Sequence, residues 1–324
     1  MGRRVGSTAR GFRASVGLVH AVIGFTNLGS ALAAESPGPA RPGNALAETT
    51  LGEIVRANLE PSYLAYPQGL KGLEPLYFEA SIVPNFSVLP RRWHVALFLT
   101  PKIVLRMFRE ESTPVKTPSY MPRLTAFFWF QEKPTPFTPY FSASLAHHSN
   151  GQSGAFSNPD GSRNHDSGSF DTNHVDLAVY PLWWQYPLFT WNSLTVEYHP
   201  PFLQDADLRE TYGNTRLHWA TTVLTTRGAL VSQLSVRLTA IIGPMEKPSN
   251  GAAEFWARVP LLVRYTVRPP MIDVGVYAAY YQGQDYYNVW YDRFISAFQV
   301  GISGNLSTGI DFDMDQVGGE RATN

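Results

Sequence analysis

The chain contains no cysteine among its 324 residues, and charged residues make up only 16 % of it. The absence of cysteine excludes stabilisation by disulfide bonds. The charged fraction is well below the roughly 25 % of an average soluble protein, and 26 basic residues balance 26 acidic ones. Without a basic surplus, the composition gives no indication of nucleic-acid binding. Aromatic residues, in contrast, reach 13 %.

The amino terminus has the pattern of a secretory signal peptide. A cluster of arginines precedes a mostly apolar stretch over residues 16–32. The small residues that end this stretch predict cleavage after Ala33. A membrane-anchoring helix is the alternative reading, although His20, Asn27 and several glycines and serines interrupt the apolar run. We therefore expect the mature chain to be exported.

From about residue 70 onward, polar and apolar residues alternate with the period of two that is typical of β-strands. In FSASLAHHS, residues 141–149, one face carries phenylalanine, alanine and leucine before it reaches His147 and Ser149. Segments 194–199 and 234–240 show the same two-sided pattern. We expect these segments to be strands with one apolar and one polar face.

Aromatic residues cluster near the ends of such segments, at 127–130, 180–191 and 277–294. Aromatic rings at strand ends are typical of the girdles of membrane barrels, and segments of about ten residues are long enough to cross a bilayer as tilted strands. An exported chain without a long apolar helix after its signal peptide satisfies its backbone in lipid only as a closed barrel. We therefore predict a transmembrane β-barrel, with a secreted β-sandwich as the alternative. The expected organisation is a signal peptide over 1–33, a flexible leader over 34–70, a barrel over 71–305 and a C-terminal tail over 306–324.

The stretch HHSNG, residues 147–151, ends the first of these strands. Side chains two positions apart on a strand share a face, so His147 can approach Ser149 and accept its hydroxyl proton, as a general base does for a serine nucleophile. Alternatively, the strand simply reaches the headgroup layer, where histidine and serine are well accommodated. A catalytic histidine needs a third group that accepts from its other nitrogen. Asn173 occupies the same face and the same rim in the next predicted strand, and its amide oxygen accepts without adding a charge near hydrocarbon.

These residues resemble the outer membrane phospholipase A family. HHSNG is similar to the family's His-x-Ser-Asn-Gly motif, and SGSFDTN, residues 167–173, is similar to the stretch that carries the triad asparagine. The resemblance implies an all-β fold, a twelve-stranded antiparallel transmembrane barrel. It also implies a catalytic triad of Ser149, His147 and Asn173, dependence on calcium, and activity as a homodimer.

The same resemblance implies a set of calcium ligands. EESTPVKTPSYMP, residues 110–122, resembles a segment in which a hydroxyl residue before proline reaches the metal site of the partner, which indicates Thr113. Ser169 matches the hydroxyl ligand by its distance before Asn173, and Gln152 matches a residue that contributes its backbone carbonyl. Two features depart from the family: the connection that contains these ligands is longer, and the C-terminal residues lack a terminal aromatic.

The expected function is calcium-dependent hydrolysis of phospholipid acyl esters, as a phospholipase A1 or A2, in the outer membrane of a Gram-negative bacterium. Two other barrels are alternatives. A lipid A deacylase also uses His-x-Ser but pairs its histidine with glutamate, and a non-catalytic porin-like barrel would have a wide polar lumen. A secreted soluble lipase is excluded, because the sequence contains no Gly-x-Ser-x-Gly nucleophile elbow.

Overall fold

The fold is described by a computed structural model for residues 58, 60–88, 94–112, 115–130, 139–180, 189–227, 230–246, 251–260 and 272–310. All of these residues belong to the second of two compact units of the chain, Leu46–Asn324. The predicted signal peptide, most of the predicted leader and the chain beyond Ile310 lie outside the described residues. The predicted calcium ligand Thr113 lies outside them as well.

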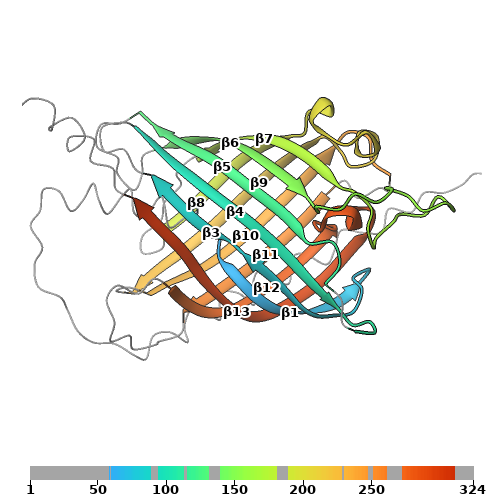
Figure 1. The fold of residues 1–324 in the computed structure, drawn as a ribbon. Helices are drawn as coiled ribbons and strands as arrows, with labels where there is room; N and C mark the ends of the chain where they lie inside the picture. Colours follow the sequence, from blue (N-terminus) through green and yellow to red (C-terminus); the bar gives the residue numbers. More distant parts are fainter. Residues whose placement is uncertain are drawn as a thin grey trace, which may run out of the picture. The chain divides into compact units, whose positions relative to one another are not determined.

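The described residues form a closed sheet of β-strands (Figure 1). β2 and β3 are two parts of one strand, interrupted at Val83, because both pair with β4. With these two counted together, twelve strands surround the barrel, and the pairing of β1 with β13 closes it. The strands are β1 (Ser62–Lys71), β2 (Leu76–Ile82), β3 (Pro84–Val88), β4 (Val95–Phe108), β5 (Ser119–Trp129), β6 (Tyr140–Ser149), β7 (Asp171–Tyr180), β8 (Phe189–Tyr198), β9 (Thr215–Arg227), β10 (Leu230–Ile242), β11 (Gly251–Pro260), β12 (Ile272–Gln284) and β13 (Phe294–Ile310).

The last strand, β13, closes the barrel by pairing with two different strands. β1, which starts at Ser62, pairs antiparallel with β13. Beyond the start of β1, β13 continues to Ile310 and pairs parallel with β3, whereas the other pairings of named strands are antiparallel. The first strand therefore begins earlier, and the last one ends later, than the sequence predicted. The sequence signal for β1 is weak, because β1 contains Pro67 and Gly69 and neither residue type favours a strand.

Side chains along the strands alternate between the lumen and the outer surface of the barrel. In β6, Ser142, Ser144 and His148 are buried, whereas Phe141 is 39 % exposed and Leu145 is 63 % exposed on the outside. A polar interior inside an apolar outer band is the pattern of a barrel that spans a membrane. The prediction of an all-β, twelve-stranded transmembrane barrel is thus confirmed. The outer apolar face continues on the neighbouring strands with Leu177, Val179, Leu194, Val196, Leu217 and Trp219.

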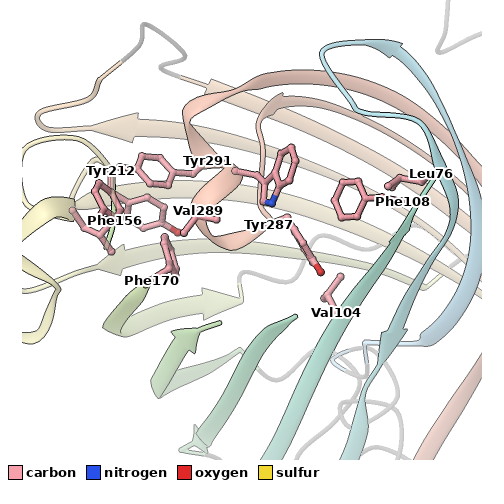
Figure 2. Packing of buried hydrophobic residues seen from close by; sticks show 11 residues of the cluster. Leu76, Val104, Phe108, Phe156, Phe170, Tyr212, Tyr287, Val289 and Tyr291 are labelled. Carbon is pink, nitrogen blue, oxygen red and sulfur yellow. The ribbon is translucent and has the colours of Figure 1, made fainter. Parts of the chain in front are cut away.

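One mouth of the barrel is filled by a buried hydrophobic cluster, which we call the plug (Figure 2). The connection between β12 and β13 contributes the 3-10 helix η4 (Asn288–Asp292), whose side chains are all buried. Phe170 also belongs to the plug and directly precedes β7, so this mouth is the end of the barrel at which β6 ends and β7 begins. The plug consists of Leu76, Val104, Phe108, Phe156, Phe170, Leu208, Tyr212, Tyr287, Val289, Trp290 and Tyr291.

The connection between β8 and β9 lies at the same mouth. It contains two short 3-10 helices, η2 (Pro201–Leu203) and η3 (Ala206–Leu208). Phe202 and Leu203 of η2 are exposed, whereas Leu208 of η3 packs into the plug. Within the part of the chain that the structure describes, no helix is both long enough and apolar enough to cross a membrane.

Candidate active site

β6 and β7 bring His147 and Asn173 together on the outer face of the barrel. The antiparallel register sets the two residues directly opposite each other. His147 Nδ1 lies 3.0 Å from the amide oxygen Oδ1 of Asn173, which is a hydrogen-bonding distance. Both side chains are partly buried and stand where the apolar band of their strands ends. The structure thus joins the histidine and the asparagine that the sequence analysis singled out.

A second set of contacts fixes the orientation of the Asn173 amide. Its Nδ2 donates to the backbone carbonyl of Leu203 at 3.1 Å and to Oδ1 of Asp171 at 3.4 Å. Because a carbonyl and a carboxylate only accept hydrogen bonds, the amide nitrogen faces them and the amide oxygen faces His147. His147 therefore carries its proton on Nδ1 and donates it to Asn173. Its other nitrogen, Nε2, is left to accept a proton.

Ser149 ends β6 on the same outward face as His147. Alternate residues of a strand are about 6.8 Å apart, and no hydrogen bond joins His147 to Ser149 among the described residues, so the structure places the two side chains on one face without bringing them into contact. The Ser149 side chain is half-buried, so an ester that lies against the outer face of the barrel can reach its hydroxyl. A hydroxyl, an imidazole and an amide acceptor in this order can act as nucleophile, general base and orienting group.

The sequence analysis did not identify the carboxylates at this rim. Asp171 pairs with Ser149 in the strand register, and its Oδ1 lies 3.8 Å from His147 Nδ1. The backbone N–H of Asp205 donates to the carbonyl of Asp171 at 3.0 Å. Burial, together with the carboxylates of Asp171 and Asp207, raises the pKa of Asp205. The rim beside Ser149 therefore carries negative charge that favours a bound cation.

Asn150 closes the connection between β6 and β7 at its base. Its buried side chain donates to the carbonyl of Gly168 at 2.7 Å and accepts from the N–H groups of Gln152 at 3.2 Å and Phe170 at 3.1 Å. Gly151 follows with a φ of 66°, a conformation that glycine adopts without the steric cost of a side chain. The Asn-Gly pair of the HHSNG motif therefore acts as the clamp of this connection.

The clamp determines where two of the predicted calcium ligands lie. Gln152 is exposed just after the clamp, and Ser169 lies half-buried on the returning segment. The N–H of Ser169 donates to the carbonyl of Gly154 at 3.0 Å, so the two segments run side by side next to the end of β6. A hydroxyl, a backbone carbonyl and the carboxylate of Asp171 are the hard oxygen donors that calcium prefers. The chemistry of these donors therefore suits a calcium ion.

Another group of potential metal ligands lies in the lumen, where atoms of His174, Asp176 and Glu197 lie within 4.8 Å of one another. Both carboxylates have cationic partners, since Arg216 contacts Glu197 at 3.3 Å and Arg123 lies 3.6 Å from Asp176. Glu197 also accepts hydrogen bonds from two further histidines, at 2.7 and 3.2 Å. Because two arginines balance the two carboxylates, a divalent cation would meet no net negative charge there. We interpret this group as a polar network that fills the lumen.

The outer face also carries an apolar groove of about 610 Å³. Its lining residue on β6 that lies nearest to His147 is Ala143, four residues away, which corresponds to about 13 Å. The groove runs across the strands within the apolar band and does not include His147, Ser149 or Asn173. The groove is shared by five neighbouring strands and is lined by residues that include Phe128, Phe141, Ala143, Leu177, Leu194 and Leu217.

The sequence matches no protein-family model and no curated protein. Solved structures do match. The outer membrane phospholipase A from Escherichia coli aligns with a TM-score of 0.51 and 16 % identity over 79 % of this chain and 97 % of that one. The calcium-bound dimer of the Salmonella typhi outer membrane phospholipase aligns with a TM-score of 0.51 and 15 % identity over 80 % and 97 % of the two chains. The resemblance noted in the sequence is thereby confirmed at the level of the fold.

Proposed function

We propose that this chain is an outer-membrane phospholipase A that hydrolyses acyl esters of phospholipids with a Ser-His-Asn triad. The observation that carries the proposal is the 3.0 Å hydrogen bond between His147 and Asn173, on the outer face of the barrel and two residues from Ser149. A triad in this position meets the lipids that surround the barrel. It does not face the lumen, whose mouth is occupied by the plug.

In this mechanism, Nε2 of His147 accepts the hydroxyl proton of Ser149 as the serine oxygen attacks the ester carbonyl. The imidazolium that forms continues to donate through Nδ1 to the amide oxygen of Asn173, which holds the ring in place. His147 then passes the proton to the oxygen of the leaving lysophospholipid, and the acyl group stays on Ser149. In the second half, His147 accepts a proton from water as the water oxygen attacks the acyl-enzyme, and it returns this proton to the Ser149 oxygen as the ester bond breaks and the fatty acid leaves.

The oxyanion that develops during each attack needs stabilisation close to Ser149. We assign this role to the backbone N–H of Ser149 and to a calcium site formed by Ser169, the Gln152 carbonyl and Thr113 from a second copy of the chain. The carboxylate of Asp171 adds negative charge to this site. When bound, calcium would polarise the ester carbonyl as a Lewis acid. In this proposal the enzyme is active as a homodimer.

Two observations favour this function over the alternative barrels. A lipid A deacylase pairs its catalytic histidine with glutamate, whereas His147 here is bonded to the amide of Asn173. A porin-like barrel would need an open passage, whereas the plug and the charged side chains occupy the lumen within the described residues. The apolar band of the barrel, together with the predicted signal peptide, supports a place in the outer membrane of a Gram-negative bacterium.

The decisive test is fatty acid release from defined phospholipids and from lipid A in detergent, with calcium and with a chelator. We expect release from phospholipids, dependence on calcium, and loss of activity in Ser149→Ala. Release from lipid A alone would establish the deacylase instead. Equal, negligible release by the wild type and Ser149→Ala from every lipid would exclude both hydrolases.

A further inference from the structure

The connection between β8 and β9 leaves the barrel wall and then returns to the triad. β8 pairs with β7 only as far as Tyr198. Nearer the rim, Gln204 becomes the neighbour of β7 through an antiparallel bridge with Thr172. Residues 201–205, which we call the rim segment, therefore replace β8 beside the end of β7 that carries Asn173.

The rim segment makes the contact that orients Asn173. The backbone carbonyl of Leu203 accepts from Asn173 Nδ2 at 3.1 Å, whereas the contact of the same nitrogen with Asp171 is longer, at 3.4 Å. If the Leu203 carbonyl moved away, the amide could rotate and present its nitrogen to His147. A nitrogen donor cannot accept the Nδ1 proton of His147, so the triad geometry depends on the position of this carbonyl.

Apolar side chains are exposed on the rim segment next to this carbonyl. Phe202 is 79 % exposed, Leu203 is 42 % exposed, and η2 contains no buried residue. Because the side chain of Asn173 points outward, the carbonyl that reaches it comes from the outer side of the rim, where the apolar band ends. Aromatic rings at that level of a membrane barrel lie among lipid headgroups. A bilayer would therefore bury the side chain that the protein leaves exposed.

We infer that Phe202 is a positioning residue: inserted into the lipid interface, it holds the rim segment against β7 and keeps the Leu203 carbonyl on the amide of Asn173. The inference rests on the proposed function, since it assigns a further residue to the same triad. According to this inference, the orientation of the Asn173 amide depends on lipid. The amide keeps its oxygen toward His147 most of the time when a lipid surface surrounds the rim segment.

The first experiment tests whether position 202 lies in lipid, independently of activity. The chain has no cysteine, so Phe202→Cys provides a single site for a nitroxide label in phosphatidylcholine vesicles. Leu177→Cys on the outer apolar face and Ser157→Cys on the exposed β6–β7 connection are the reference sites. We expect the label at 202 to be relaxed mainly by oxygen, as at 177. Relaxation mainly by a water-soluble nickel complex, as at 157, would overturn the inference.

The second experiment tests whether Phe202 acts through Asn173. In phosphatidylcholine mixed micelles, Phe202→Ser should lower kcat by about 3- to 10-fold, the effect of one neutral hydrogen bond, with little change in KM. Phe202→Leu should restore most of the rate. Phe130→Ser is the matched control. Phe130 is also 79 % exposed, but it directly follows β5 at the other mouth of the barrel, away from Asn173. This variant should hydrolyse phosphatidylcholine at the wild-type rate.

The double variant separates positioning from a general effect on lipid binding. In an Asn173→Ala background, Phe202→Ser should cause no further loss, since the contact that it supports is already gone. A full additional loss there, or wild-type kcat in Phe202→Ser alone, would refute the positioning role. A failure of the proposed function would be seen in a different experiment, as equally low fatty acid release by the wild type and Ser149→Ala. In that case the labelling experiment would still show whether Phe202 contacts lipid.

Discussion

Replacing Asn173 with alanine tests the contact on which the proposed triad depends. The variant loses a 3.0 Å hydrogen bond to an imidazole that becomes charged in the transition state. Hydrogen bonds to charged groups contribute about 1.5–3 kcal/mol, which corresponds to a fall in kcat of about 10- to 150-fold. The His147 side chain is 34 % exposed, so water replaces part of the lost interaction and the effect should lie in the lower part of this range.

The assay is fatty acid release from phosphatidylcholine in mixed micelles with calcium, with kcat and KM determined separately. KM should change little, because Asn173 holds the catalytic base and does not bind the acyl chain. Asn158→Ala is the matched control, since among the described residues the Asn158 amide donates within its own connection, to Ser162 and Arg163. Wild-type kcat in Asn173→Ala, or an equal fall in Asn158→Ala, would show that the amide does not orient His147.

Three further predictions follow from the same site. Ser149→Ala should abolish hydrolysis without unfolding the barrel, and heat-dependent mobility in gels would show that the barrel stays folded. His148→Ala, on the lumen side, should retain activity. If His148→Ala were inactive and Ser149→Ala active, the assignment of the two faces of β6 would be wrong. Asn150→Ala removes three hydrogen bonds, two of them buried, so limited proteolysis should cut the β6–β7 connection faster and calcium should activate at higher concentration; unchanged cleavage would show that Asn150 does not hold this connection. Thr113→Val should weaken the calcium-driven dimer in sedimentation experiments, and full activity in chelator would remove calcium from the mechanism.

The barrel could be predicted because its strands obey a strict period of two. In β6 the alternation of lumen and lipid faces follows directly from the residue types, from Phe141 to Ser149. The ends of the barrel were harder to predict. Pro67 and Gly69 interrupt the pattern of β1, and the parallel contact of β13 with β3 depends on strand register, which leaves no periodic signal. The number of strands was implied by the resemblance and not by the alternation alone.

The pairing of His147 with Asn173 could be predicted for the same reason, because the two residues share a face and a rim in successive strands. Leu203 could not, since it is 30 residues away from Asn173 and contributes a backbone carbonyl, which any residue type provides. Asp171 had a weak signal in its position two residues before Asn173. The contacts that orient Asn173 thus depend on tertiary structure, whereas the residues of the proposed triad could be identified from local sequence pattern.

The lumen and the outer face are linked through alternate residues of the same strands. His148, between His147 and Ser149, points inward and contacts the ring of Phe170 in the plug, with 4.7 Å between ring centroids. Thr172, next to Asn173, also points inward, and its hydroxyl lies 2.8 Å from His199 Nδ1. Each outward residue of the proposed triad is therefore flanked by a buried residue, and His148 and Thr172 make contacts inside the barrel. The register of β6 with β7, which sets His147 opposite Asn173, is thus accompanied by contacts inside the barrel, whereas the contact of Asn173 with Leu203 lies at the outer rim.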